Sequence, residues 1–408
     1  MRLSEEQKSF LAGKAGAGTK KAMEILGALG KIYGARDMVP IVSAHISGVS
    51  YNNIGDPGLG FLRDWADMGN RARVPAFMNP AGVDRKLWKK LGISQQFATK
   101  QLEIIQHLTR LGIQPLLTCT PYHLGMAPEM GQHIAWSESS AIAYANSVLG
   151  ARTNREGGPS ALAAALAGYT PRFGLHLDAE RRATHHIRIS CRVENQADFG
   201  ALGYLIGKKI AGGIPFFEGL SMPDNVSKAT TYLKALGAAM AATGAVALFH
   251  IAGVTPEANA LGQRLIRKDA VEIRIDNLSE AYAALKRDAG VVDMVAIGCP
   301  HASIEELNEI ARLLNGKKLK ARLWVTTSSE TREAAMNEGI AQIIDRAGGT
   351  IVADTCIVVA PLAELGIKRI ATNSGKAASY LPSHQNAYTY FGTTEQCIQA
   401  AIEGKWTI

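Results

Sequence analysis

Three of the five cysteines occupy the same kind of position, where an apolar run ends and the chain turns. They are Cys119 in "PLLTCTP", Cys299 in "VAIGCPH" and Cys356 in "ADTCIVVAP". Ligands of open α/β sheets bind at the carboxyl ends of the strands, so thiols placed there can meet although they are far apart in sequence. Thiolates bind soft metals and iron clusters. The pattern predicts a metal site, and the alternative is that each cysteine is a small buried apolar side chain.

The other cysteines and the histidines carry weaker signals. Cys191 lies on the apolar face of an alternating segment, and Cys397 lies on the apolar stripe of a helix that starts at Thr393, so both fit a core role. The histidines show no HExxH motif and no paired spacing, which argues against a zinc site. His301, two residues after Cys299, is the one histidine of interest.

Strands and helices alternate along the segments that must position these thiols. After residue 290 the expected order is strand "VVDMVAIG", helix 303–316 with a capping box, strand "ARLWVTT", helix 330–349, strand "TIVADTCIVVA" and strand "GIKRIATN". The first half repeats this with helices 19–34 and 97–112 and strands "MVPIVSAHIS", "RVPAFMNP" and "QPLLTCTP". We expect an α/β fold with mostly parallel, doubly wound sheets in lobes spanning about 1–150, 151–230 and 231–408.

Composition narrows the class of protein. The chain has 408 residues, 47% of them hydrophobic, which suffices for more than one lobe. Its net charge of +8 is spread without an aromatic-interleaved basic tract, so nucleic-acid binding has no support and a small anionic substrate remains compatible. Residues 236–254 are long enough to span a membrane, but Gly244 divides them into a buried helix and a buried strand. The charged N-terminus is unlike a signal peptide, which predicts a cytoplasmic protein with reduced thiols.

Several longer motifs resemble one family. They are "SAHISGVSYNNIGD", "CTPY", "WSESSAIAYANSVLGARTNREGGPSALAAA", "GCPH", "ADTC" and "NSGKAASYLP", and together they resemble the large subunit of the aconitase X family over nearly the whole chain. The resemblance implies an aconitase-like hydro-lyase with three lobes around a central metal-binding cleft. It also implies iron held by Cys119, Cys299 and Cys356, as a 4Fe-4S cluster, a 2Fe-2S cluster or a mononuclear iron.

Activities of this family include dehydration of mevalonate 5-phosphate, to trans-anhydromevalonate 5-phosphate, and of cis-3-hydroxy-L-proline. In both, hydroxide leaves from the carbon β to a carboxylate, and iron with three protein ligands keeps a position open to polarise that hydroxyl. In the superfamily, a serine on a swivelling lobe takes the α proton. The resemblance implies that this lobe is a separate small partner subunit, which carries the base.

We expect mevalonate 5-phosphate as the substrate, because "SGVSY", "NPAG" and the stretch around Lys376 are similar to the archaeal form of the family. The alternative within the class is cis-3-hydroxy-L-proline. The alternative of another class is an iron-binding or iron-sensing protein without turnover, for which RNA binding would be the sign.

Two strand-following turns are candidates for holding a carboxylate or phosphate. "SGVSY" supplies Gly48, Val49 and Ser50, and "NPAG" supplies Asn79 and Pro80. Both can present backbone amides and side-chain donors to an anion. The alternative is ordinary turn chemistry.

Three further groups complete the predicted substrate site. Glu138 and Ser139 start a helix, and the alternative is a carboxylate that only offsets the helix dipole. Arg152, Asn154 and Arg155 precede a glycine pair and a helix start, which makes an anion site, the alternative being solvated surface arginines. Lys376 also sits where a helix begins, a place that disfavours a cation unless a phosphate or carboxylate binds beside it.

Overall fold

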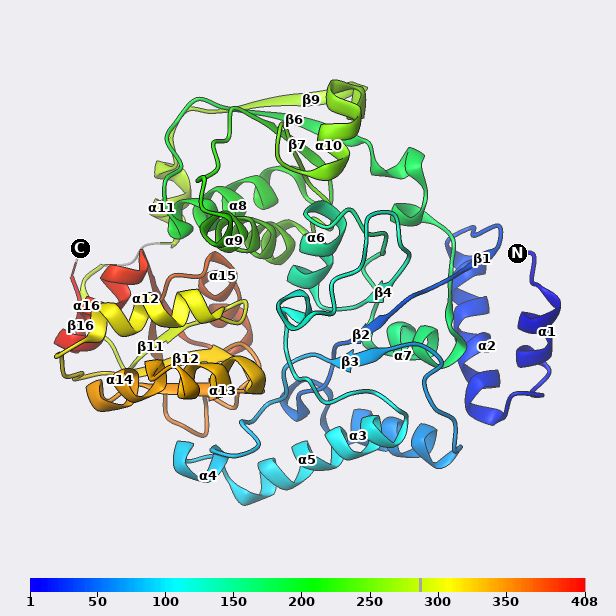
Figure 1. The fold of residues 1–408 in the computed structure, drawn as a ribbon, viewed down its shortest axis with the longest axis horizontal. Coiled ribbons are helices and arrows are strands. Elements are labelled where there is room, and N and C mark those ends of the chain that lie inside the picture. Colours follow the sequence, from blue (N-terminus) through cyan, green and yellow to red (C-terminus); the bar gives the residue numbers. More distant parts are fainter. Residues whose placement is uncertain (286–287, 408) are drawn as a thin grey trace.

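A parallel β-sheet forms the centre of each of three lobes in this computed structural model, which describes residues 1–285 and 288–407 (Figure 1). The strand orders are β3-β2-β4, β8-β7-β6-β9 and β13-β12-β11-β14-β15. Neighbouring strands in all three sheets pair in parallel. The predicted mixed α/β fold with parallel sheets is thereby confirmed.

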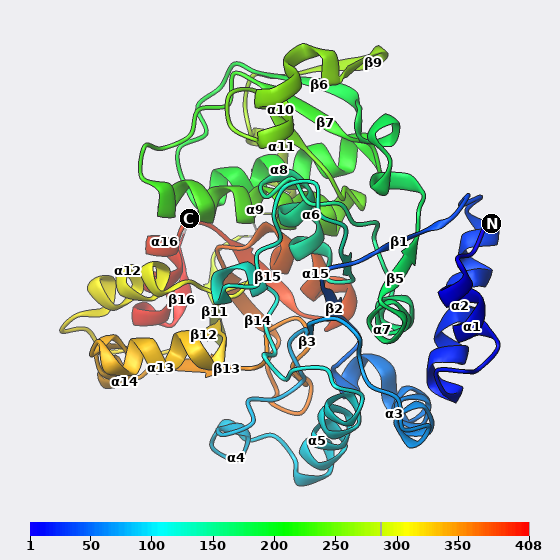
Figure 2. The ribbon, with the colours of Figure 1, turned by 45° about the vertical axis from the view of Figure 1, so that its right-hand side comes forward.

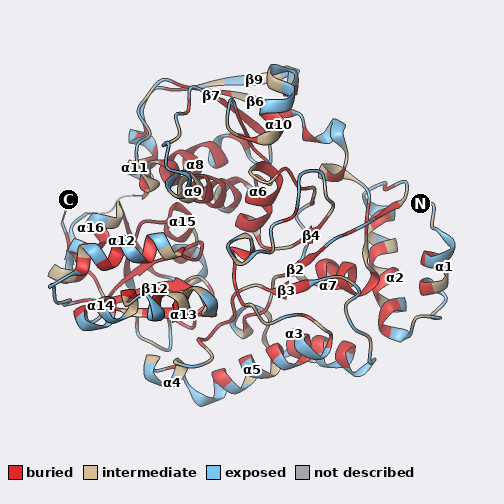
Figure 3. Ribbon diagram, in the orientation of Figure 1, coloured by how far each residue is buried: buried red, intermediate tan, exposed pale blue. Residues whose placement is uncertain are grey.

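The first lobe builds its core from β2 and β3 and from the apolar faces of four helices, α2, α3, α5 and α7. The helix α7 is buried along nearly its whole length (Figure 3). The elements of this lobe are α1 (Glu5–Leu11), α2 (Ala17–Ile32), β1 (Met38–Pro40), β2 (Ala44–Ile46), α3 (Tyr51–Asp67), β3 (Ala76–Met78), α4 (Trp88–Leu91), α5 (Gln95–Arg110), η1 (Pro121–Leu124), β4 (Ala135–Trp136), α6 (Ser139–Ser147), α7 (Gly158–Ala167) and β5 (Tyr169–Pro171).

The second lobe, green in Figure 1, rests on the packed pair α8 and α9, which α6 of the first lobe also contacts. The long edge strand β9 carries alternating charges on its exposed side, which limits edge-to-edge pairing with other chains. The elements are η2 (Gly174–His176), η3 (Asp178–Arg181), β6 (Ala183–Ile189), α8 (Gln196–Ile210), β7 (Pro215–Glu218), α9 (Val226–Gly244), β8 (His250–Ile251), α10 (Pro256–Leu261), η4 (Gly262–Leu265), β9 (Ile266–Ile275) and α11 (Ser279–Leu285).

The third lobe has helices on both faces of its sheet. Val295 and Ile297 of β11 face the core shared with α12, α14 and α16, whereas Met294 and Ala296 face α15 and the segment 356–367. In Figure 2, α15 lies between this sheet and α9, against which it packs. The elements are β10 (Gly290–Val291), β11 (Met294–Ile297), α12 (Ile304–Leu314), β12 (Arg322–Thr327), α13 (Ser329–Asn337), α14 (Ile340–Ala347), β13 (Thr350–Ala353), β14 (Arg369–Thr372), α15 (Gly375–His384), β15 (Tyr388–Phe391), α16 (Thr394–Glu403) and β16 (Lys405–Trp406).

The structure corrects several predicted elements. The strand expected over 38–47 is two strands of different sheets, β1 and β2, and the helix expected over 330–349 is two helices, α13 and α14. Two further predicted strands fail at cysteines. The strand expected over 350–360 ends at Ala353, because Asp354 adopts a left-handed conformation with φ 66°. The strand expected over 114–121 is reduced to an isolated bridge at Gln114, and Leu117 has φ 46°. Cys191 likewise lies beyond the end of β6 and not on its apolar face, because the strand stops at Ile189. The thiols Cys119 and Cys356 therefore lie in loops.

The apolar stretch 236–254 divides as expected. Its first part belongs to α9, which ends at Gly244, and β8 follows within the second lobe. In the part of the chain that the structure describes, no helix combines the length and hydropathy needed to cross a bilayer.

Candidate metal and substrate site

The three strand-end cysteines converge where the lobes meet. Cys119, Cys299 and Cys356 are all buried, with exposed fractions of 5%, 8% and 8%. Cys356 acts electrostatically on Cys119, and Cys299 acts on Cys356, so the thiols are near neighbours. A direct link is the backbone N–H of His301, which donates a hydrogen bond to the Cys119 sulfur at 3.2 Å. The structure brings together the three thiols that the sequence singled out.

Burial makes these thiols weak acids. It raises the pKa of Cys119 and Cys299 and brings the pKa of Cys356 to about 12, while the charge of Lys376 opposes the rise at each of them. At neutral pH the thiols are protonated unless a cation is bound beside them. Metal binding here must therefore release protons.

The donor set is three thiols, and thiolates bind soft metals and iron clusters. Among residues 1–285 and 288–407, the side chains form no ready-made site of three or more His, Cys, Asp or Glu for a metal ion. The residues present fit a soft metal group through the chemistry of their sulfur atoms.

Beside the thiols lies a buried ion pair between Lys376 and Glu138, which are 238 residues apart in sequence. Ser140 Oγ donates to the second carboxylate oxygen at 2.6 Å, and Lys376 Nζ lies 3.3 Å from Ser140 Oγ. The same carboxylate caps α6, because the backbone N–H of Ala141 donates to it at 2.7 Å. Ser139 Oγ also donates to it, at a longer distance of 3.4 Å. Glu138 is thus ordered by four donors.

The pair stays ionised although it is buried. Burial disfavours the Glu138 carboxylate, but the charge of Lys376 and the hydrogen bonds from Lys376, Ser140 and Ala141 outweigh it and bring the pKa of Glu138 to about 2. Burial likewise disfavours the Lys376 ammonium, and the Glu138 charge holds the pKa of Lys376 above its ordinary value. Glu138 is therefore an acceptor near pH 7 and not a general acid.

The start of α15 explains why Lys376 reaches this point. Ser374 caps the helix through its side chain, so Lys376 lies in the first turn, where the helix dipole disfavours a cation. A Cβ on Gly375 would lie 2.7 Å from the Gly200 carbonyl oxygen, so only glycine lets α15 sit this close to α8. The sequence predicted a bound anion to offset the Lys376 charge, and the chain itself supplies one carboxylate, that of Glu138.

The two predicted anion-binding turns lie next to Cys356. Ser50 Oγ donates to the carbonyl of Val359 at 2.9 Å, which ties the turn of Gly48, Val49 and Ser50 to the loop that carries Cys356. Asn79 is fixed by its backbone N–H to Ile46 at 2.9 Å, and its side-chain oxygen is buried without a hydrogen-bond partner. Pro80 immediately follows, so the structure brings both turns to the thiols.

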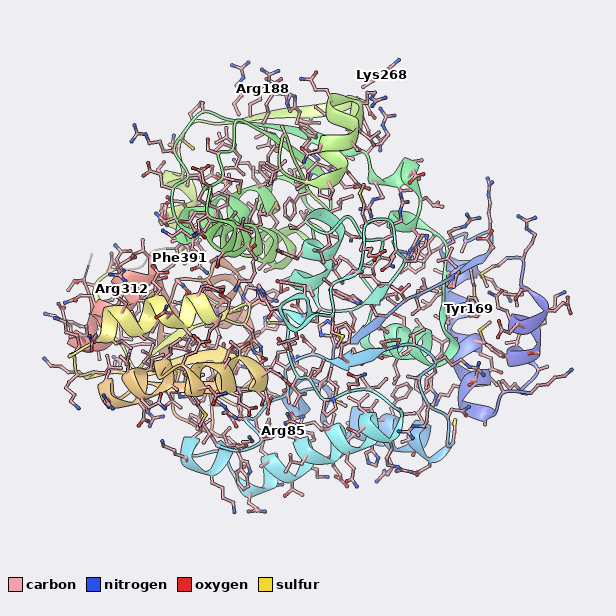
Figure 4. All side chains as sticks on the ribbon, in the orientation of Figure 1. Arg85, Tyr169, Arg188, Lys268, Arg312 and Phe391 are labelled. Atoms are coloured by element: carbon pink, nitrogen blue, oxygen red, sulfur yellow. The ribbon has the colours of Figure 1, made fainter. Side chains whose placement is uncertain are left out.

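An ion pair that the sequence did not reveal joins the first and third lobes. Arg85, labelled in Figure 4, donates through Nε to Asp354 Oδ2 at 2.7 Å, and Ser329 Oγ donates to Oδ1 at 2.7 Å. The Asp354 carbonyl accepts from the backbone of Ala81 at 2.8 Å. These bonds hold Asp354 in its left-handed conformation and place the Asn79 turn beside Cys356. The chain separation of 269 residues left no sequence signal.

The hydrogen bonds of Arg152, Asn154 and Arg155 go to residues 173–178 and to Ala245. Arg152 pairs with Asp178 and donates to the carbonyl of His176 at 3.3 Å. Asn154 Nδ2 donates to the carbonyl of Phe173 at 3.1 Å, and Arg155 is exposed, with a long contact of 3.5 Å to Ala245. These side chains hold the loop before α7 against residues 173–178.

Two more buried hydroxyls near the thiols have no hydrogen-bond partner in the described part of the chain. They belong to Thr355, next to Cys356, and to Tyr122, which follows Cys119 by three residues and stacks on Tyr144 with ring centroids 3.9 Å apart. Sequence reasoning missed both, since a threonine or tyrosine beside a buried strand end carries no signal of its own. Unpaired buried hydroxyls are costly, so they mark where a ligand can bind.

Three family models match consecutive parts of the chain. They are described as the first, second and third domains of aconitase X and match residues 1–179, 183–283 and 292–403.

Curated relatives and one solved structure are similar over almost the full length. The phosphomevalonate dehydratase large subunits of Methanocaldococcus jannaschii and Methanosarcina mazei are 46% and 45% identical, over 98% and 99% of this chain and 100% and 98% of theirs. The cis-3-hydroxy-L-proline dehydratase of Pseudomonas aeruginosa is 33% identical over 99% of this chain and 70% of its own length. The holo-form crystal structure of Thermococcus kodakaraensis aconitase X matches with a TM-score of 0.90 and 43% identity, over 98% of this chain and 100% of that one.

Proposed function

The chain belongs to the aconitase X family and is a hydro-lyase of that family, and on that premise we propose that it is the large subunit of an enzyme that dehydrates mevalonate 5-phosphate. The proposed substrate rests on the similarity to whole phosphomevalonate dehydratase large subunits, at 44–46% identity. The cis-3-hydroxy-L-proline dehydratases are 33% identical and longer than this chain. The reaction removes a hydroxyl and a neighbouring proton as water and leaves a carbon–carbon double bond.

The proposed cofactor is an iron–sulfur cluster held by Cys119, Cys299 and Cys356. Their burial at one junction and their soft donor atoms support it, and the relative from Thermococcus kodakaraensis was solved in a holo-form. Three thiolate ligands are compatible with a 4Fe-4S cluster that has one open corner, with a 2Fe-2S cluster and with a mononuclear iron. When bound, iron with an open position supplies the Lewis acid that makes hydroxide a better leaving group.

The substrate would lie between the thiols, the ion pair and the two turns. Lys376 offers positive charge to the substrate carboxylate, and ionised Glu138, with Ser139 at the start of α6, accepts and donates hydrogen bonds at the hydroxyl-bearing end. The turn of Gly48, Val49 and Ser50, with Asn79 and Pro80, would hold the other anionic end. The unpaired Asn79 oxygen and the Thr355 and Tyr122 hydroxyls would gain partners there.

In this proposal, the role of Arg152, Asn154 and Arg155 is to hold the loop that leads into α7, through their hydrogen bonds. The first residue of α7, Gly158, lies against the turn of Gly48, Val49 and Ser50, because a Cβ on Gly158 would lie 2.5 Å from the Ser47 carbonyl oxygen. This close approach places the N-terminus of α7 behind the Gly48 turn.

The base that removes the α proton would come from a partner. Near the thiols, Glu138 is committed to Lys376, and burial lowers the pKa of His45 and of His301 to about 4, so both are neutral and bound to carbonyl oxygens. The relatives are named as large subunits, which implies a small subunit. We propose that a serine of that subunit is the base and that the two chains form a heterodimer.

The test is anaerobic purification with the small subunit, followed by iron and sulfide quantitation and turnover of both candidate substrates. We expect iron in the wild type, its loss in Cys119→Ser, Cys299→Ser and Cys356→Ser, and its retention in Cys397→Ser, a buried thiol of the third-lobe core. Turnover of cis-3-hydroxy-L-proline alone would overturn the substrate. An iron-free but active complex would overturn the cofactor, and an inactive iron-loaded chain that binds RNA would favour the sensing alternative.

A further inference from the structure

We propose that His301 is a positioning residue that fixes the three cysteine loops relative to one another, an inference that rests on the proposed iron centre. His301 is fully buried and lies two residues after Cys299. Its four polar groups bind three segments of the chain, at Thr118 and Cys119, at Lys234 and at Thr355. The junction of the lobes is therefore organised around one side chain.

The imidazole ring joins the loops of the other two cysteines. Its Nε2 lies 3.0 Å from the carbonyl oxygen of Thr355, the residue before Cys356. Its Nδ1 lies 3.1 Å from the hydroxyl of Thr118, the residue before Cys119. One rigid ring thus spans from the end of β13 to the loop after Gln114, and its own backbone continues from Cys299.

The bonding partners assign the tautomer. A carbonyl oxygen only accepts, so Nε2 carries the proton and donates it to Thr355. In the neutral ring Nδ1 then accepts, and the Thr118 hydroxyl donates to it. Thr118 Oγ1 in turn accepts from the backbone N–H of Thr120 at 3.1 Å. All polar atoms of this link are satisfied, so the ring has one orientation.

The backbone of His301 completes the link. Its N–H donates to the Cys119 sulfur at 3.2 Å, and its carbonyl accepts from Lys234 Nζ, in α9 of the second lobe, at 2.9 Å. Lys234 is itself paired with Glu306, which belongs to the capping box of α12. His301 therefore contacts all three lobes, and an N–H donor at a ligating sulfur favours the charge that the sulfur carries when metal is bound.

No other side chain reproduces both ring contacts. Asparagine places an acceptor near Nδ1 and glutamine places a donor near Nε2, but neither does both. Leucine removes both contacts. The series His301→Gln, His301→Asn and His301→Leu therefore removes the two ring contacts separately and together. Thr118→Val removes the ring contact to the Cys119 loop, together with the bond from the Thr120 N–H within that loop, and leaves the ring contact to Thr355 in place.

The experiment measures amide hydrogen exchange on the metal-free chain and iron content after anaerobic reconstitution of the same variants with the small subunit. We expect His301→Leu to exchange about tenfold faster in both residues 117–122 and 353–358, because one buried hydrogen bond contributes about that factor to an opening equilibrium. Thr118→Val should accelerate only residues 117–122. His301→Gln should keep 353–358 protected, and His384→Gln, at an exposed site, should change neither.

Iron content separates positioning from general destabilisation. His301→Leu should retain less than about half of the wild-type iron, and His301→Gln should recover part of it. Unchanged exchange in both loops, or full iron in His301→Leu, would overturn the proposal. If His301→Leu does not fold, the same reasoning applies to Thr118→Val, whose equal effect on both loops would overturn it. A wild type that takes up no iron would refute the cofactor, and the exchange data on metal-free protein would still decide whether His301 couples the loops.

Discussion

The Lys376–Glu138 pair gives the sharpest quantitative prediction. Replacing Lys376 with methionine keeps the length of the side chain but leaves the buried Glu138 carboxylate without its cation. The pKa of Glu138 falls from 4.5 to about 2 in the folded protein, and each unit corresponds to about 1.4 kcal/mol, so the ionised form gains about 3 kcal/mol. Breaking a buried ion pair typically costs about 3–5 kcal/mol, in agreement with this value. We therefore expect Lys376→Met to lose about 3 kcal/mol of the free energy of unfolding at pH 7.

The assay is urea unfolding of the metal-free chain, monitored by tryptophan fluorescence. The free energy of unfolding is taken from the first transition. The matched control is Lys90→Met, because Lys90 pairs with Asp345 at 3.9 Å and both side chains are exposed. An exposed pair contributes at most about 1 kcal/mol. In the double variant Lys376→Met/Glu138→Gln, no charge is left buried, so part of the lost stability should return.

The pH dependence follows from the same shift. A carboxylate whose pKa is depressed stabilises the fold above its unfolded pKa, and that contribution is lost as the pH falls through the folded value. In Lys376→Met, burial without the Lys376 charge raises the pKa of Glu138 above its ordinary value, so the difference between the wild type and the variant should narrow as the pH falls from that raised pKa to about 2. A loss no larger than that of Lys90→Met, or a double variant as unstable as the sum of its single changes, would refute the reasoning.

Three further outcomes can be measured on the same chain. Asp354→Asn weakens the ion pair with Arg85 and should lower the thermal midpoint by several degrees, at about 2–4 °C per kcal/mol. An unchanged midpoint would mean that this ion pair does not stabilise the fold. Gly158→Ala places a Cβ 2.5 Å from the Ser47 carbonyl oxygen, so KM should rise about tenfold with kcat less affected, and equal kinetics would exclude a substrate role for the Gly48 turn. Because burial raises the pKa of Cys119, Cys299 and Cys356, iron uptake should release protons and strengthen from pH 7 to 9, and uptake independent of pH would contradict thiolate ligation.

Local patterns predicted much of the third lobe. The helix expected over 303–316 was recognisable from its capping box and apolar face, and α12 shows both, with Ser303 and Glu306 bonded reciprocally. The division of 236–254 at Gly244 was equally visible, because a glycine between an alanine-rich and a β-rich segment is a local signal. These two predictions are confirmed, whereas the helix predicted over 330–349 is divided into α13 and α14 at Gly339, which has φ 78°.

The errors lie where distant residues determine the local conformation. The aliphatic run around Cys356 predicts one strand. In the structure, Arg85 and Ser329 hold Asp354 in a left-handed conformation, and the strand ends there. Glu138 and Lys376 are likewise 238 residues apart, and the ring of His301 contacts residues 183 and 54 positions away. Motif composition could single out the thiols and Lys376, but the contacts that arrange them exist only between lobes.

The wide separation of the partners around the thiols also bears on how the protein is made. Arg85 and Asp354 are 269 residues apart, and Thr118 and His301 are 183 apart. At about 5–20 residues per second, the ribosome releases Cys119 well before Cys356. The first lobe can collapse around its own sheet in that interval, but its thiol has no companions yet. The proposed iron centre would therefore form only after synthesis of the third lobe, when all three thiols are present.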